Sequence, residues 1–135
     1  MKIVFDMQNG FHIPENNYVV DLTEYEKIFI NNLLDMLNSE VEQDKLDIVK
    51  KSSSYTTITY TAGSRVDDLI RFKLTDLTMW AAVFMTRENA QANKNNPVFS
   101  AQKNKNQLYW KAKLSSPTNC AFLKPFILDA IKIFK

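Results

Sequence analysis

The spacing of apolar residues changes twice along this chain of 135 residues, and these changes restrict the fold more than any other feature. In residues 24–38 apolar side chains recur every three or four positions, as in a helix with one buried face. From residue 55 the period falls to two, which is typical of half-buried strands. Helical spacing returns after residue 116. The pattern predicts an α+β fold, an antiparallel sheet of four or more strands flanked by an N-terminal and a C-terminal helix.

The strands of the sheet are expected in the second half of the chain, at residues 55–61, 68–74, 79–85 and 107–114. The third of these is apolar on both faces, which predicts a central strand covered on two sides. The alternation places Trp80 and Trp110 inward, and in the last strand it also places Leu108, Ala112 and Leu114 inward. Residues 3–5 and 18–20 are expected to form short strands around a turn that contains Gly10 and Pro14, while residues 40–50 fit either a short helix or the approach to a strand.

Helix boundaries can be predicted from a few polar residues and prolines. Thr23 and Glu26 have the spacing of a capping box, in which each side chain accepts a hydrogen bond from a free backbone N–H at the helix start. Ser116 followed by Pro117 favours the start of the C-terminal helix, with serine as the cap. Pro125 is then expected to kink or split that helix.

The chain has the length of one domain, residues 1–135, with an N-terminal strand and helix extension (1–50) before the sheet and C-terminal helix (55–134). No apolar run reaches the roughly 18 residues of a membrane span. The N-terminus meets an acidic residue too early for a signal peptide, and the single cysteine, Cys120, cannot form an internal disulfide. We therefore expect a cytoplasmic protein that does not enter a membrane, and its oligomeric state is left open.

Several common enzyme classes lack their required residues here. The two glycines, Gly10 and Gly63, exclude the glycine-rich loops that bind nucleotide phosphates. One histidine, His12, and one cysteine cannot supply the three or four ligands of a zinc site. Asp67 and Asp68 are adjacent, so in a strand they should point to opposite faces rather than share a cation.

Two further catalytic arrangements are also disfavoured. Cys120 precedes apolar residues at the expected start of a helix, where a buried thiol is more common than a nucleophile. No lysine has an acidic residue two positions before it, so the metal-dependent nuclease core with a (D/E)xK motif is absent. We expect a protein that is not an enzyme and has no catalytic residue, metal site or cofactor.

Charge is distributed unevenly along the chain. Residues 1–68 contain 6 basic and 12 acidic residues, whereas residues 69–135 contain 11 basic and 3 acidic residues. The alternation of the expected strands predicts that several polar residues share one sheet face or lie close together in space. They are Arg71, Lys73, Tyr109, Lys111 and Lys113. Such an arrangement suits an anionic partner, although a solvated surface has the same composition.

A polar segment between the third and fourth strands extends the basic surface. Residues 89–107 are rich in Asn and Gln, contain Lys94, Lys103 and Lys105, and have one apolar anchor at 97–99. The composition predicts a basic loop. Its amides could bond to bases or phosphates, and its lysines could neutralise phosphates.

The second half of the chain resembles a known family. The run NKNQLYWKAKL at 104–114, followed by a short loop and a last helix, is similar to the end of MmcQ/YjbR-like proteins. Residues 70–73 (IRFK) and Met79-Trp80 also resemble uncharacterised domains of Gram-positive bacteria. Over residues 55–134 the resemblance implies a "double wing" α+β fold, for which DNA binding has been proposed. The N-terminal extension and the ending Ile133-Phe134-Lys135 depart from the family pattern.

The sequence therefore favours a small, non-enzymatic binding domain that contacts nucleic acid through a basic strand face and an Asn/Gln-rich loop. The expected phosphate contacts come from six cations, and Tyr109 is expected to stack on a base. The six cations are Arg71, Lys73, Lys103, Lys105, Lys111 and Lys113.

Two alternatives remain open. The chain could be a protein-interaction module, for example a mobile-element or phage inhibitor, that binds a partner protein through its acidic half with Glu40, Glu42, Asp44 and Asp47. It could also be an enzyme with carboxylates and lysines in a pocket that the sequence does not reveal.

Overall fold

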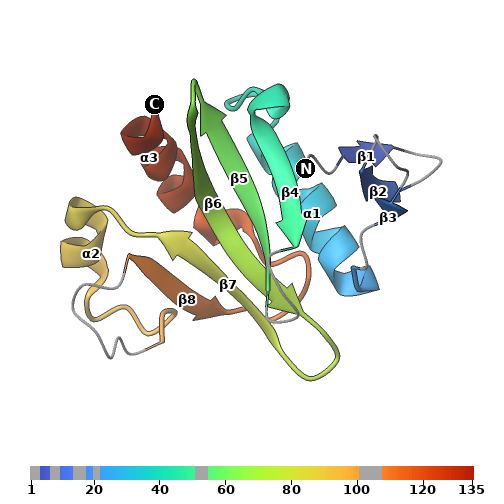
Figure 1. The fold of residues 1–135 in the computed structure, drawn as a ribbon. Coiled ribbons are helices and arrows are strands. Elements are labelled where there is room, and N and C mark those ends of the chain that lie inside the picture. The colour runs from blue at the N-terminus through green and yellow to red at the C-terminus, as the bar shows by residue number, and fades with distance from the viewer. Residues whose placement is uncertain (1–3, 7–9, 14–17, 20–21, 51–54, 101–107) are drawn as a thin grey trace.

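Five strands form the main sheet in the order in which they follow along the chain, each antiparallel to the next (Figure 1). This computed structural model describes residues 4–6, 10–13, 18–19, 22–50, 55–100 and 108–135. The strands are β4 (Leu46–Lys50), β5 (Thr56–Ala62), β6 (Arg65–Leu74), β7 (Met79–Phe84) and β8 (Tyr109–Lys113). The predicted α+β class and antiparallel sheet are confirmed. Residues 40–50 were expected to form either a short helix or the approach to a strand. They contain a 3-10 turn, η1 (Gln43–Lys45), which leads into β4.

A separate small sheet precedes the first helix. Its strands β1 (Val4–Asp6), β2 (Gly10–Ile13) and β3 (Tyr18–Val19) are paired antiparallel in that order. Gly10 was expected in a turn, but it begins β2 and pairs with Asp6. A glycine at the end of a strand weakens the pairing little, so the prediction from its turn preference was wrong. Pro14 lies outside the described residues.

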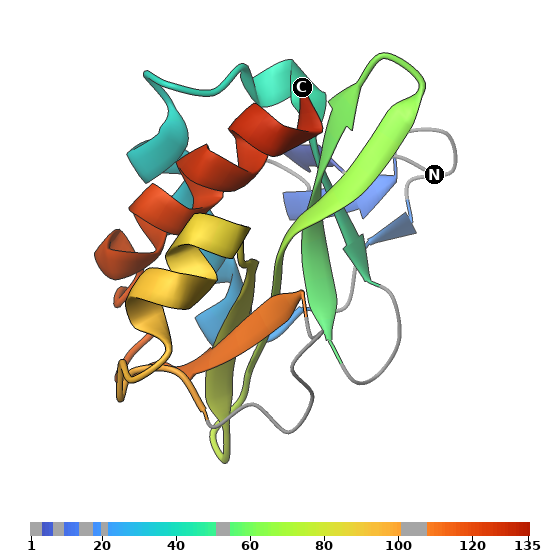
Figure 2. The same ribbon diagram turned by 90° about the vertical axis from the view of Figure 1, so that its left-hand side faces the viewer.

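Two helices, α1 (Glu24–Leu37) and α3 (Lys124–Phe134), lie on the same side of the main sheet (Figure 2). Phe29 of α1 packs against Phe72 of β6, with ring centroids 5.0 Å apart. Apolar residues of α3, among them Ile127 and Ala130, are completely buried in the same core. One face of the sheet therefore lies in the core against the helices, and the opposite face is called the outer face below.

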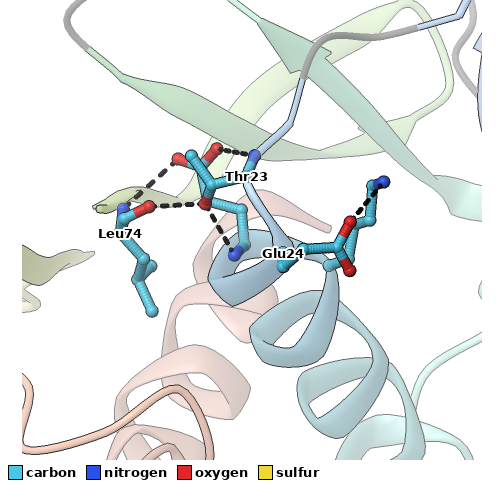
Figure 3. Close-up of polar contacts among 5 residues, drawn as sticks. Thr23, Glu24 and Leu74 are labelled. Atoms are coloured by element: carbon cyan, nitrogen blue, oxygen red, sulfur yellow. Dashed lines mark hydrogen bonds and ion pairs between the residues drawn. The ribbon is translucent and has the colours of Figure 1, made fainter. Parts of the chain in front are cut away.

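The start of α1 is bonded to the end of β6 (Figure 3). The predicted capping box is present, with the Glu26 backbone N–H donating to Thr23 Oγ1 at 3.1 Å and the Thr23 N–H donating to Glu26 Oε1 at 3.0 Å. The same two side chains also bind both backbone groups of Leu74. Thr23 Oγ1 donates to the Leu74 carbonyl at 2.5 Å, and the Leu74 N–H donates to Glu26 Oε2 at 3.3 Å.

The C-terminal helix begins later than its serine–proline signal predicts. Ser116 and Pro117 lie in a turn region, and a 3-10 turn, η2 (Ala121–Leu123), precedes α3. Pro125 lies in the first turn of α3, and the helical segment is divided just before it into η2 and α3, which agrees with the expected split. Proline lacks an N–H, and the first turn is where a helix leaves its N–H groups unbonded, so Pro125 is accommodated there.

A short helix, α2 (Arg87–Asn93), occupies part of the segment predicted to be a loop. Thr86 caps it by accepting a hydrogen bond from the Asn89 N–H at 3.1 Å. The Asn89 amide also donates to Asp129 of α3 at 2.9 Å. The cap and this contact favour a helix in a sequence rich in residues of modest helix propensity.

One β-bulge changes the alternation of β6. Thr59 of β5 pairs with Asp68 while Ile58 pairs with Ile70, so Leu69 is an extra residue in β6. Leu69 and Ile70 are consecutive and both are completely buried. Because the bulge shifts the period by one residue, Asp68 and Arg71 lie on the same face although they are three positions apart.

Candidate functional site

The register of β6, β7 and β8 brings five of the predicted site residues to the outer face. Arg71 pairs with Ala82, which pairs with Lys111 in the next strand. Lys73, Trp80 and Lys113 form the neighbouring row across the same three strands. Tyr109 follows the alternation of Lys111 and Lys113 along β8. We call this surface the basic–aromatic face; it consists of Tyr55, Arg71, Lys73, Trp80, Tyr109, Lys111 and Lys113.

Trp80 belongs to this face and not to the core. Its row partners are Lys73 and Lys113, and its indole is half-buried. The Lys111 Nζ lies 4.1 Å from the centroid of a Trp80 ring, a cation–π distance. The inward prediction was wrong because β7 is apolar on both faces, so alternation alone did not identify the core side. Side chains of neighbouring strands, rather than a second layer of helices, flank β7 on the outer face.

Trp110 does point inward as predicted. It pairs with Val83, which pairs with the buried Ile70, and its ring packs edge-on against Phe99 at 5.7 Å. Ala112 and Leu114 are buried, again as predicted. Leu108 is 58% exposed, which contradicts its inward prediction. It precedes the first residue of β8, so the strand alternation does not extend to it.

Arg71 is held by contacts on several sides. Its guanidinium carbon lies 3.8 Å from the centroid of the Tyr109 ring and 5.6 Å from that of Tyr55. Its Nε donates to Asp68 Oδ2 at 2.9 Å. The Tyr109 hydroxyl in turn donates to the backbone carbonyl of Asp68 at 2.8 Å. The β-bulge makes this arrangement possible, because it places Asp68 on the outer face beside Arg71.

The environment of Tyr109 favours its neutral form. Burial raises the pKa of Tyr109 to about 12, and the nearby Arg71 only partly opposes this change. Asp68 and Asp67 act in the same direction as burial. One ring face carries Arg71, so that face is not available to stack on a base as the sequence had suggested.

The lysines of the basic–aromatic face differ from most cations elsewhere in the fold. Lys111 and Lys113 are exposed and Lys73 is half-buried, and in the described part of the chain none of the three forms an ion pair with a carboxylate. By contrast, Lys27, Lys45, Arg65, Lys124 and Lys132 each pair with an acidic residue. Three uncompensated charges on one face form a surface of positive potential.

Two hollows open on or beside this face. The first has a volume of about 430 Å³ and extends to the turn between β6 and β7. The second has a volume of about 250 Å³ and has Ala82 among its lining residues. Trp80 and Lys111 line both hollows, so the two hollows adjoin at this pair.

The remaining predicted cations are not all placed. Lys103 and Lys105 lie outside the described residues. Lys94 is exposed at the C-terminal end of α2 and is not part of the cross-strand rows of β6–β8.

The residues considered for other activities have structural roles. Cys120 is buried in the core, and burial raises the pKa of its thiol. Asp67 and Asp68 bind Arg65 and Arg71 within the sheet. No group of three His, Cys, Asp or Glu residues suited to a metal ion occurs within the described ranges. Over the same ranges no helix is long and apolar enough to span a membrane.

The acidic set proposed for a protein partner is partly neutralised. Glu40 forms an ion pair with Lys124 at 3.3 Å, and Glu42 forms one with Lys45 at 3.3 Å. Asp47 of β4 is half-buried. These contacts leave less net negative charge on this surface than the sequence suggests.

No protein-family model, curated protein or solved structure matches the chain. The resemblance to MmcQ/YjbR-like proteins therefore stays a prediction.

Proposed function

We propose that the protein is a non-enzymatic nucleic-acid-binding domain and that the basic–aromatic face is its binding surface. The observation that carries the proposal is the presence, on one sheet face, of three lysines that have no carboxylate partner among the described residues, beside half-buried aromatic rings. Lysines that neutralise phosphates release bound counterions, which supplies affinity without regard to sequence. Aromatic rings among them offer contacts to bases.

Each part of the face has a distinct task in this proposal. Lys111 and Lys113, which are exposed and two residues apart on β8, contact consecutive parts of a phosphate backbone. Lys73 adds a third charge across β7. Trp80 is the principal ring for base contacts, because it lines both hollows. Lys111 lies over one of its rings, as Arg71 lies over Tyr109, so the base meets the part of the indole that Lys111 leaves uncovered.

The test is a titration of fluorescently labelled oligonucleotides, followed by fluorescence anisotropy at several salt concentrations. With three or four phosphates neutralised, the affinity for a single strand should fall about 20- to 50-fold between 50 and 200 mM salt. Reversal of two charges, Lys111→Glu with Lys113→Glu, should weaken binding and reduce the salt dependence.

A matched control separates this surface from overall charge. Lys132→Glu with Lys135→Glu changes the net charge by the same amount, but on exposed residues at the end of the chain. The control should retain most of the affinity. Absence of binding at low salt, or equal losses in the two double variants, would contradict the proposed function.

A further inference from the structure

The two hollows differ in the chemistry of their walls. The smaller hollow is lined mainly by rings and apolar groups, with Tyr55, Trp80, Leu108 and Tyr109 around Ala82, and the cations Arg71 and Lys111 complete its lining. The larger hollow is more polar, with Thr78, Lys111 and Lys113 among its lining residues. It also includes one acidic residue, Asp76, at the turn between β6 and β7. One hollow thus suits a flat apolar group, and the other suits an anionic group beside it.

The smaller hollow exists because residue 82 is small. Ala82 lies between Arg71 and Lys111 in the same cross-strand row, and its side chain is on the outer face, two residues along β7 from that of Trp80. A longer side chain at this position would fill the hollow without removing any cation of the face.

We infer that the basic–aromatic face binds an unpaired strand of nucleic acid, with one base in the smaller hollow against Trp80 and the adjoining phosphate in the larger one. This inference rests on the proposed function and adds the class of nucleic acid. A base inside a duplex is stacked and paired, so its ring cannot enter a recess, whereas an unpaired base presents its ring to aromatic side chains.

The position of Lys111 supports the same arrangement. Its Nζ lies over Trp80, and both residues line both hollows, so a strand that occupies the two hollows passes beside this charge. Lys113 lies one strand repeat further along β8, about 7 Å away at the backbone. It lines the larger hollow, which receives the phosphate.

The first experiment compares four probes with the wild-type protein in low salt: a single-stranded oligonucleotide, its duplex, an abasic strand of the same length, and polyglutamate. The abasic strand retains phosphates but has no bases. Because stacking adds binding free energy for each bound base, the intact strand should bind about 5- to 150-fold more tightly than the abasic strand. It should also bind more tightly than the duplex and than polyglutamate.

The second experiment uses Ala82→Leu, whose folding is checked by circular dichroism and thermal unfolding. This variant should lower the affinity for the single strand towards that of the abasic strand while leaving the salt dependence unchanged. Trp80→Ala should have the same effect, and it provides a second measurement if the leucine disturbs the sheet. In a Trp110→Phe background, quenching of the remaining indole should report the base directly.

The outcomes distinguish the inference from the proposed function. Equal affinity for the intact and abasic strands, or a preference for the duplex, overturns the inference while leaving nucleic-acid binding in place. Equal affinity for polyglutamate and for the intact single strand overturns both the inference and the proposed function, because the face would then recognise negative charge alone. Failure of all four probes to bind likewise overturns both.

Discussion

Arg71 stacks on Tyr109, with its guanidinium carbon 3.8 Å from the centroid of the ring. The hydroxyl of the same tyrosine binds the backbone of Asp68, whose carboxylate accepts a hydrogen bond from Arg71. The three residues therefore form a closed set of contacts across β6 and β8. The charge of Arg71 is largely compensated by Asp68, whereas Lys111 and Lys113 have no carboxylate partner among the described residues.

Neutralisation should consequently lower the stability of the protein at Arg71 but not at Lys113. Arg71→Gln removes a cation–π contact and a charge-assisted hydrogen bond, so we expect a loss of about 1–3 kcal/mol in the free energy of unfolding. Lys113→Gln should change stability by less than about 0.5 kcal/mol, as is usual at exposed sites. Urea denaturation measures both changes.

The same two variants can be compared in nucleic-acid binding. Lys113→Gln should reduce the slope of log affinity against log salt by about 0.7, the contribution of one phosphate contact to a single strand. Arg71→Gln should reduce it by much less. A larger slope change in the arginine variant would show that Arg71 contacts phosphate directly.

The raised pKa of Tyr109 predicts a pH dependence of stability. The pKa is about 12 in the folded protein and about 10 in an unfolded chain. Between these values the unfolded state has lost the proton that the folded state retains, so stability falls as the pH rises. The contribution is complete below pH 10 and is lost as the pH approaches 12.

Because Tyr109 is only half-buried, solvent screening reduces this contribution to about 1 kcal/mol. Urea denaturation of the wild type and of Tyr109→Phe between pH 9 and 11.5 isolates it, since the lysines titrate equally in both proteins. The stability difference between them should shrink with rising pH. A constant difference would mean that the hydroxyl ionises normally.

Glu26 should contribute far more to stability than its neighbour Glu24. Glu26 is almost fully buried and accepts hydrogen bonds from the N–H groups of Thr23 and Leu74. Glu26→Ala leaves both donors without an acceptor, and we expect a loss of about 2–4 kcal/mol in the free energy of unfolding. Chemical denaturation followed by circular dichroism measures the loss.

Glu24→Ala is the matched control, because it removes the same side chain two residues earlier in the same helical turn. Glu24 is exposed and forms an ion pair with Lys27 at 3.1 Å (Figure 3), so its removal should cost about 0.5 kcal/mol or less. Similar losses in the two variants would show that the bonds to β6 contribute little.

The sequence predicted those parts of the fold in which a local pattern has one structural meaning. The capping box at Thr23 and Glu26 is such a pattern, and so is the alternation that places Lys111 and Lys113 on one face of β8. The helix α1 and the antiparallel sheet follow from the change of period. These features depend mainly on residues near each other in sequence, which is why they could be predicted.

The errors arose where distant contacts decide between two locally reasonable structures. Trp80 could face either way in a strand that is apolar on both sides, and the register with Lys73 and Lys113 decides it. The bulge at Leu69 has no sequence signal of its own, yet it brings Asp68 beside Arg71. Likewise, α2 depends in part on the contact of Asn89 with a residue 40 positions away.

The position of β8 has a consequence for the protein whether or not a ligand is bound. β8 is the last strand of the sheet. Among the described residues, two neighbours contact its outer edge: Phe99 forms a bridge with Ala112, and the Ser100 N–H donates to the Lys111 carbonyl at 2.8 Å. Lysines on an edge strand discourage pairing with the edge of another molecule. Lys111 and Lys113 thus help to prevent copies of the chain from aggregating through their sheets, and acidic replacements preserve that protection where apolar ones would remove it.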